Sequence, residues 1–418
     1  MSNVRGTGAH GRRRRVSDRL AVIVTSFALV GAAACGATTA GSASEAPSSG
    51  GPSGGTPTPT TTVTLRNVDV TVIYPLPRAS QIDALLAPSS VGRGGPLVGK
   101  DVFDKGNVPE LDESAGLPDD DARLAAMRVV ALRYDPCAGV TMPPKDSAGC
   151  VPQLRLVFQS LDASSASTRA RDGALHAFYR LDRTAAAEIE EQLRSMRAGR
   201  ASDPEMPLGV HPRLAEEGPA GPYGSALRSL VLAHAGPENL VRVTTFSRIA
   251  NAHFDWKFAI RERSAAGFTD GSIATIGKNS QIVRTISGGR LDADFDPPSG
   301  SPDDPTRLFK VSSGEQPSSF KATAKVLNPR THSSESVDCG PCHVAPDVAV
   351  FAEQALMLPL DPDTRFVTSY PLAATAKPVE DAFGLKNLHM LSYLDRTLNV
   401  SARSANETAA ILEYLNAR

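Results

Sequence analysis

Three residues near the C-terminal end have types and a spacing that can do chemistry. Cys339, Cys342 and His343 form the pattern Cys-Gly-Pro-Cys-His, in which an imidazole directly follows the second of two thiols. Two thiols at this spacing can each add to one vinyl group of a haem, and the histidine is then placed to bind the iron. The same thiols can instead exchange with a substrate disulfide, or bond to each other as a small structural disulfide.

The motif resembles the haem-attachment site of c-type cytochromes, and the resemblance covers only the C-terminal part of the chain, 322–418. It implies one covalent haem c, with Cys339 and Cys342 as the thioether residues and His343 as the proximal iron ligand. A protein of this kind transfers single electrons to a redox partner, which the sequence does not name. We therefore expect an electron carrier rather than an enzyme.

The sixth iron ligand in that family is commonly a methionine in the C-terminal half of the domain. Met390 lies 47 residues after His343 and before the last predicted helix, so the resemblance implies Met390 as the distal ligand. A thioether in this position would favour reduced iron and raise the reduction potential. His389 and His332 are alternatives for the same position, and Met390 can also be read as an ordinary core residue.

Two other protein classes remain open for the Cys-Gly-Pro-Cys segment. Thioredoxins carry the same four residues at the start of a helix, directly after a buried apolar strand. Here the preceding segment 330–338 is polar and lacks the alternation of a strand, which argues against a thioredoxin. A thioredoxin-like thiol oxidoreductase is therefore kept only as an alternative. The other alternative is a periplasmic or surface binding lipoprotein in which the two cysteines form a structural disulfide.

The N-terminus has the order of an export signal. Arginines occupy 12–15, an apolar run extends over 20–34, and three alanines precede Cys35. This order resembles a bacterial lipobox, which implies a signal peptide over 1–34 and lipidation of Cys35. The alternative is an ordinary secretory signal cut near Ala34. We expect a lipid-anchored protein of the bacterial cell envelope, at the outer membrane or facing the periplasm.

A tether follows the cysteine over 35–64, because this segment is almost wholly Gly, Ala, Ser, Thr and Pro. The formal charge of the 418-residue chain is -1, but six arginines and one aspartate belong to the export signal. Taking these from the 44 basic and 45 acidic residues leaves 38 and 44, a charge near -6. This balance excludes a nucleic-acid-binding footprint, and the membrane contact is expected only through the lipid.

The region 65–296 is predicted to be an α+β domain with a mostly antiparallel sheet, because its strands outnumber its helices and do not alternate with them. Helices are predicted over Thr184–Arg197 and from Tyr223 to His234. Isolated histidines in this region are predicted to be structural, and no convergent Ser/His/Asp set is recognised. The predicted strands cover 68–74, 127–134, 153–159, 175–181, 240–246, 254–260, 272–276 and 281–286, and the isolated histidines are His176, His211, His234 and His253.

Cys137 and Cys150 lie at the two ends of a loop that contains proline and glycine, between two predicted strands. An exported chain most often pairs such cysteines, so we predict a disulfide between them. Closing this loop would stabilise the fold by about 3 kcal/mol, less any strain.

The C-terminal part is predicted to be a linker over 297–321 and a small, mainly α, cytochrome c-like domain over 322–418. One helix is predicted over Val348–Met357, after the motif. A closing amphipathic helix is predicted over Ser404–Arg418, with a capping box formed by Ser404 and Glu407.

Overall fold

The computed structural model describes residues 63–103, 116–144, 149–162, 168–250, 254–286, 290–297, 300–301, 303–310, 316–372 and 387–418. The predicted signal peptide, Cys35 and all but the last two residues of the predicted tether lie outside this part of the chain. Residues Thr61–Arg418 form one compact unit.

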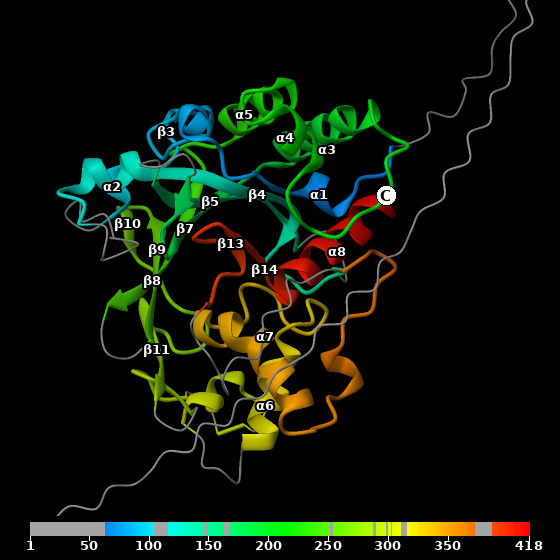
Figure 1. Ribbon diagram of the computed structural model, residues 1–418. Coiled ribbons are helices and arrows are strands. Elements are labelled where there is room, and N and C mark those ends of the chain that lie inside the picture. The colour runs from blue at the N-terminus through cyan, green and yellow to red at the C-terminus, as the bar shows by residue number, and fades with distance from the viewer. Residues whose placement is uncertain are drawn as a thin grey trace, which may run out of the picture. The chain divides into compact units, whose positions relative to one another are not determined.

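A ten-stranded antiparallel sheet forms the centre of this unit (Figure 1). The α+β class and the mostly antiparallel sheet predicted for the middle region are therefore confirmed. The main strand order is β1-β4-β5-β7-β8-β9-β11-β12, with β6 paired to β5 and β10 to β9. The strands of this sheet are β1 Thr71–Ile73, β4 Met127–Ala138, β5 Val151–Asp162, β6 Arg169–Ala170, β7 Ala174–Arg180, β8 Leu240–Ala250, β9 Phe254–Ser264, β10 Gly267–Asp270, β11 Ser280–Ile286 and β12 Arg290–Ala293.

Helices cover both faces of the sheet, and two hairpins lie beside it (Figure 1). The hairpins are β2 Val91–Gly92 with β3 Gly95–Pro96, and β13 Leu391–Leu394 with β14 Thr397–Val400. The α-helices are α1 Asn67–Val70, α2 Asp120–Ala126, α3 Arg183–Ala198, α4 Pro212–Glu217, α5 Pro222–His234, α6 Gln316–Lys325, α7 Cys339–Gln354 and α8 Ala402–Asn416. The 3-10 turns are η1 Ala79–Ala84, η2 Lys100–Val102, η5 Pro305–Phe309 and η6 Pro362–Thr364.

Side-chain alternation along the strands decides what each face of the sheet carries. Tyr134 on β4 points towards α3, where its hydroxyl donates to Glu190 over 2.8 Å. Its neighbour Arg133 points the other way, and its guanidinium meets Glu407 of α8 at 2.5 Å. In register with Arg133 are Arg155, then Phe178 and Arg242 on the next strands. This face, towards α7 and α8, is therefore unusually polar for a buried surface.

The predicted independent C-terminal domain is not a separate unit. Helix α8 packs against the first residues of the chain that the structure describes, since the Thr408 and Thr71 hydroxyls lie 2.8 Å apart. The backbone N–H of Leu65 also donates to the Asn416 side chain over 3.1 Å. Part of the predicted linker is ordered as η5 and the start of α6. Burial of one shared apolar surface joins the C-terminal elements to the sheet, because neither part has a complete core of its own.

Four local predictions differ from the structure. The predicted strand over 68–74 begins with the single turn α1, and the predicted strand over 272–276 is a turn that follows β10. Helix α7 begins at Cys339 rather than near Val348, and it contains Pro346. Helix α8 begins earlier than predicted because Ser401, not Ser404, is its N-cap, accepting from the Ser404 N–H over 3.1 Å.

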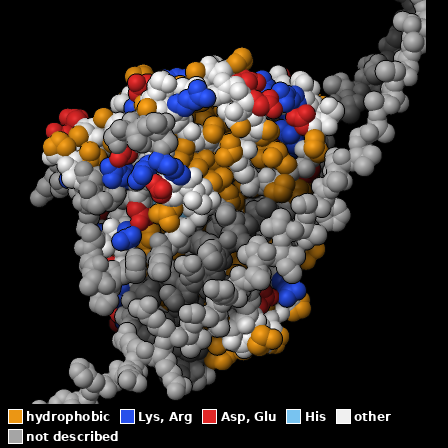
Figure 2. Space-filling view, in the orientation of Figure 1, with side chains coloured by type: hydrophobic (Ala, Val, Ile, Leu, Met, Phe, Trp, Pro, Cys, Tyr) orange, Lys and Arg blue, Asp and Glu red, His pale blue; other side chains and the backbone are white. Residues whose placement is uncertain are grey.

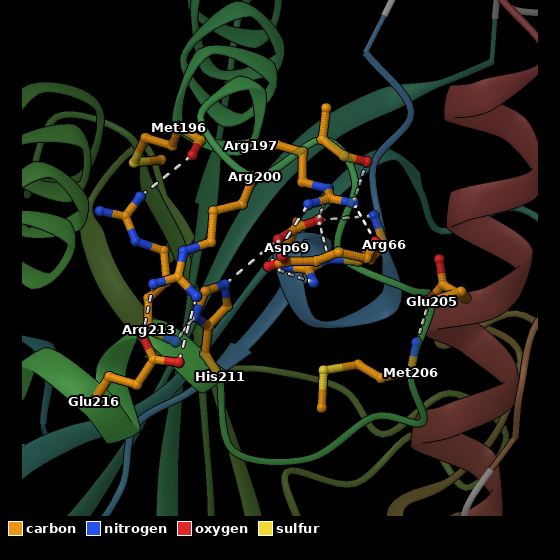
Figure 3. A network of polar contacts seen from close by, with 12 residues as sticks. Arg66, Asp69, Met196, Arg197, Arg200, Glu205, Met206, His211, Arg213 and Glu216 are labelled. Atoms are coloured by element: carbon orange, nitrogen blue, oxygen red, sulfur yellow. Dashed lines mark hydrogen bonds and ion pairs between the residues drawn. The ribbon is translucent and has the colours of Figure 1, made fainter. Parts of the chain in front are cut away.

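A buried polar network anchors the first helical turn to the elements above the sheet (Figure 3). The Asp69 carboxylate meets Arg66 at 3.1 Å and Arg197 of α3 at 3.5 Å. His211 accepts from the Arg213 N–H at Nδ1, so its Nε2–H faces Asp69 at 3.4 Å. Burial alone would raise the pKa of Asp69, but the hydrogen bonds from His211 and Arg66 outweigh it and lower that pKa. His211 has a partner at each ring nitrogen, which indicates a structural role.

The predicted Cys137–Cys150 disulfide is present. In the described part of the chain, no helix is long and apolar enough to cross a membrane. Figure 2 shows basic and acidic side chains close together on the visible face, where neither sign forms a continuous surface.

Candidate functional site: the motif cavity

The motif occupies the first turn of α7, and side chains from the sheet region hold that turn in place. Asp338, the residue before the helix, accepts from the backbone N–H and the hydroxyl of Thr275 over 2.6 and 2.8 Å. The Gly340 N–H donates to the Gln281 side chain of β11 over 2.6 Å. The motif is therefore fixed against one edge of the sheet rather than carried on a separate helical domain.

Gly340 is needed for this close approach. A Cβ at this position would lie 2.8 Å from Cγ2 of Val283 and 2.9 Å from Oε1 of Gln281. We expect Gly340→Ala to lower the free energy of unfolding by roughly 1–3 kcal/mol through overpacking. Urea denaturation measures the loss. The control is Gly199→Ala at the end of α3, where an added Cβ meets nothing within 4 Å; equal stability of the two variants would contradict the packing explanation.

The backbone fixes the orientation and the tautomer of His343. Its Nδ1 lies 2.7 Å from the carbonyl oxygen of Leu388. A carbonyl only accepts, so Nδ1 carries the proton and Nε2 of the neutral ring carries the lone pair. The ring packs against Phe246 and Phe258, with centroids 5.1 and 4.8 Å away. Metal-binding histidines commonly have this arrangement, in which a carbonyl orients the ring and makes the other nitrogen the ligand.

The three motif side chains open into one cavity between the sheet and α7, which we call the motif cavity. Its volume is about 150 Å³. The sheet contributes alternate residues of four neighbouring strands, and the opposite wall comes from the segment before α7 and from the C-terminal elements. The lining residues that matter for its chemistry are Arg155, His176, Phe178, Arg242, Thr244, Glu335, Cys339, Cys342, His343, Met390 and Glu407.

Both motif thiols are free of a disulfide in the structure. Burial raises the pKa of the Cys339 thiol to about 12, and the neighbouring Cys342 and Asp338 act in the same direction. Burial likewise raises the pKa of Cys342, to about 11. Both sulfurs are therefore protonated thiols at neutral pH. A helix start beside a cation would instead lower the pKa of a redox-active thiol.

Met390 lines the motif cavity together with His343. His389 is buried, with Nε2 at 2.9 Å from Asp172 and Nδ1 at 2.7 Å from the Ser392 hydroxyl. Both of its ring nitrogens are thus engaged. His332 lines a different cavity of about 20 Å³, together with Arg403.

The contacts of His389 form a Ser-His-Asp arrangement that the sequence did not reveal. Its members come from two segments, Asp172 before β7 and His389 with Ser392 at β13. Ser392 is only 1 % exposed and His389 is fully buried. A substrate cannot reach this hydroxyl in the folded protein, so the arrangement is a structural network rather than a hydrolytic triad.

His176 also lines the motif cavity, although nothing in the sequence singles it out. It lies on β7 in register with Thr244 of β8, and its ring is near Phe246 at 6.5 Å between centroids. Burial lowers the pKa of His176 well below its usual value, and the charge of Arg155 adds to the effect. The imidazole is therefore neutral at physiological pH.

Ion pairs complete the polar wall of the cavity. Arg242 of β8 meets Glu335 at 2.5 Å and Glu262 at 2.6 Å. Arg242 and Glu335 also line a larger cavity of about 630 Å³ on their other side. This ion pair thus separates the motif cavity from a wider space towards the disulfide-closed loop.

No known protein family, curated protein or solved structure matches this chain. Within the described residues, no three His, Cys, Asp or Glu side chains converge closely enough to hold a metal ion.

Proposed function

We propose that this protein carries one covalent haem c and transfers single electrons. Cys339 and Cys342 would form the thioethers, and His343 would bind the iron through Nε2. The observation that carries the proposal is the Leu388 carbonyl at Nδ1 of His343, because it sets the tautomer that an iron ligand needs. Two unbridged thiols beside a histidine prepared in this way fit haem attachment better than thiol exchange, which has no use for the histidine.

The side chains of the motif cavity include the ligand types that a haem c needs, but the volume of the cavity is small. Small-molecule sites have volumes of roughly 300–1,000 Å³, and the motif cavity has about 150 Å³. The wall formed by residues 334–337 must therefore stand further from α7 when the cavity is filled. Because the thiols lie inside the cavity, attachment is expected before this wall closes over them during folding.

A haem c held here would supply a one-electron redox centre whose potential depends on its axial ligands and surroundings. The surrounding side chains would orient and shield that centre. Phe246 and Phe258 pack on the His343 ring and limit its rotation. Met390, the sequence's candidate for the second axial ligand, lines the same cavity. Arg155 places a guanidinium in the wall, which is suited to a carboxylate group of a cofactor, whereas Arg242 is already paired with Glu335 and Glu262.

The two alternative functions have less support. A thioredoxin-like oxidoreductase needs an accessible thiolate, and burial raises the pKa values of both thiols to about 12 and 11. A binding lipoprotein with a structural disulfide needs the two cysteines to be bonded, and both are free in the structure.

The decisive measurement is the intact mass and visible spectrum of the mature protein, made in a host that attaches haem. We expect the mass of the polypeptide plus one haem, and bands typical of a c-type haem that remain after denaturing extraction. A mature protein with the bare polypeptide mass and a Cys339–Cys342 disulfide on non-reducing peptide mapping would exclude the proposal.

We further propose that the protein is lipid-anchored in the bacterial cell envelope through Cys35. Cys35→Ala should move the protein from the detergent-rich to the aqueous phase on detergent partitioning, since it removes the acceptor of the lipid. The wild-type protein is the control. Recovery of the wild-type protein in the aqueous phase would contradict the lipid anchor. The N-terminus would then be interpreted as an ordinary secretory signal.

A further inference from the structure

The carbonyl group that orients His343 belongs to a short segment outside the main sheet. Leu388 lies just before β13, and β13 forms a two-stranded sheet of its own with β14. The Nδ1–H of His343 donates to the Leu388 carbonyl over 2.7 Å, so a shift of this backbone by a fraction of an ångström would weaken the bond. Other contacts must therefore hold the segment in place against α7.

The side chain of His389, directly after Leu388, makes such contacts. Its Nε2 lies 2.9 Å from the Asp172 carboxylate and its Nδ1 lies 2.7 Å from the Ser392 hydroxyl. A carboxylate only accepts, so in the neutral ring Nε2 carries the proton and Nδ1 accepts from the hydroxyl. Asp172 lies between β6 and β7, so this ring ties the segment to the main sheet.

Aromatic side chains of the sheet hold the same ring from other sides. The centroid of the Phe246 ring on β8 lies 5.1 Å from that of His389 and 5.1 Å from that of His343. Trp256 on β9 stands edge-on to His389 at 6.1 Å, and the His389 side chain is fully buried. The two imidazoles share one aromatic neighbour, so a displacement of His389 would reach His343 through Phe246 as well as through Leu388.

The residue on the other side of Leu388 is also bonded. The Asn387 side chain accepts from the backbone N–H of His389 over 3.1 Å and donates to Asn399 of β14 over 2.7 Å. These bonds connect the segment to its own hairpin. The bond between His389 and Asp172 connects it to the sheet, and the sheet edge also fixes the first turn of α7.

We infer that His389 and Asp172 are positioning residues for His343. Their bond places the Leu388 carbonyl so that His343 keeps its proton on Nδ1 and its lone pair on Nε2. The use of that lone pair rests on the proposed function, whereas the tautomer can be measured in protein without haem. A merely structural role of the Ser-His-Asp arrangement would affect stability and leave the His343 tautomer unchanged.

The test compares Asp172→Ala, which removes the acceptor, with Asp172→Asn, which keeps an oxygen that can accept from His389. Asp172→Asn also removes the ion pair with Arg248 at 3.6 Å, so it separates that loss from the loss of the hydrogen bond. The nitrogen chemical shifts of the neutral His343 ring report its tautomer in the full mature chain made without haem. We expect the proton on Nδ1 in wild type and in Asp172→Asn. In Asp172→Ala the ratio of the Nδ1–H form to the Nε2–H form should fall roughly two- to tenfold, the effect of weakening one hydrogen bond.

Tyr393→Phe is the matched control on β13. It removes another buried hydrogen bond of the hairpin, the one that the Tyr393 hydroxyl donates to the Tyr74 carbonyl over 2.7 Å. This variant should be less stable than wild type with an unchanged His343 tautomer. An equal change of tautomer in Tyr393→Phe and Asp172→Ala would reflect general loosening of the hairpin and would overturn the inference.

Ser392→Ala removes the other partner of the His389 ring and keeps the inference testable if Asp172→Ala folds poorly. It should shift the His343 tautomer in the same direction as Asp172→Ala. Wild-type tautomer ratios in the folded alanine variants would contradict a positioning role for the network.

Reduction potentials of the haem-loaded proteins give a second readout. An imidazole whose Nδ1–H is bonded to a carbonyl is a more basic ligand, which stabilises oxidised iron. Asp172→Ala should therefore raise the reduction potential, whereas Asp172→Asn and Tyr393→Phe should keep it. Absence of covalent haem from the intact mass of the wild type would overturn the proposed function but not the tautomer result, so the two failures are distinguishable.

Discussion

Replacing both Cys339 and Cys342 with serine should abolish covalent haem attachment. The hydroxyl of serine does not add to the vinyl groups, so the intact mass should fall to that of the bare polypeptide and the visible bands should disappear after denaturing extraction. Intact-mass spectrometry and absorption spectra of equal amounts of protein measure the effect. Each single substitution leaves one thioether and should keep covalent haem at a lower yield.

The second cysteine pair provides the matched control. Replacing Cys137 and Cys150 with serine removes the same number of thiols but touches only the disulfide. We expect full haem content and a free energy of unfolding lower by about 3 kcal/mol, from the loop-closure entropy of the unfolded chain. If both double variants lost haem equally, the loss would reflect misfolding, and attachment at the motif would lack support.

Replacing Glu407 with glutamine should strongly destabilise the fold, because two buried cations share its carboxylate. The Glu407 carboxylate meets Arg133 at 2.5 Å and Arg403 at 2.7 Å, and these two guanidiniums are only 2 % and 1 % exposed. Removing the negative charge leaves both cations without their shared anion. We expect a loss of about 3–5 kcal/mol in the free energy of unfolding.

Urea denaturation measures this loss. Unfolding is monitored through the fluorescence of Trp256, the chain's single tryptophan, which is fully buried. The control on the same helix is Glu413→Gln. Glu413 pairs with Arg330 at 2.8 Å with both side chains partly exposed, so its loss should cost under about 1 kcal/mol. If the two substitutions lowered the free energy of unfolding equally, the buried ion cluster would contribute no more to stability than an exposed ion pair.

The same cluster predicts an acid-sensitive contribution to stability. Burial alone would raise the pKa of Glu407, but Arg403, Arg133 and Arg155 outweigh it and lower that pKa to about 2. A folded pKa below the unfolded value of about 4.3 means that the stabilisation is complete above about pH 5. It is lost as the pH falls towards 2, by about 3 kcal/mol in total. Glu407→Gln should lack this pH dependence.

The sheet could be predicted from the sequence because its strands alternate apolar and polar residues between turn signals. Strands β4, β5, β7, β8, β9 and β11 and helices α3 and α5 lie where the pattern placed them. The first turn of α7 could not be predicted, because its cap comes from tertiary contacts of Asp338 and Gln281 rather than from a local signal. Propensity also disfavours a helix through Pro346.

Only the Cys-Gly-Pro-Cys-His motif of the candidate site could be predicted from the sequence. Cys339, Cys342 and His343 are adjacent in the sequence, so their spacing alone is informative. His176 is 167 residues away from His343, and the two share only the lining of one cavity in the folded chain. A single histidine in a strand carries no signal of this kind, because its place in a cavity wall is decided only when the strands pair.

The contact between the first described residues and the last helix has a consequence for the order of events in folding. Leu65 and Asn416 are joined by two hydrogen bonds although 351 residues separate them. Contacts of such sequence separation form late, because a long loop must close first. The unit therefore cannot complete its fold until residues 65 and 416 are both free to meet. Until they meet, the motif cavity, which α8 helps to line through Ser404 and Glu407, also lacks one of its walls.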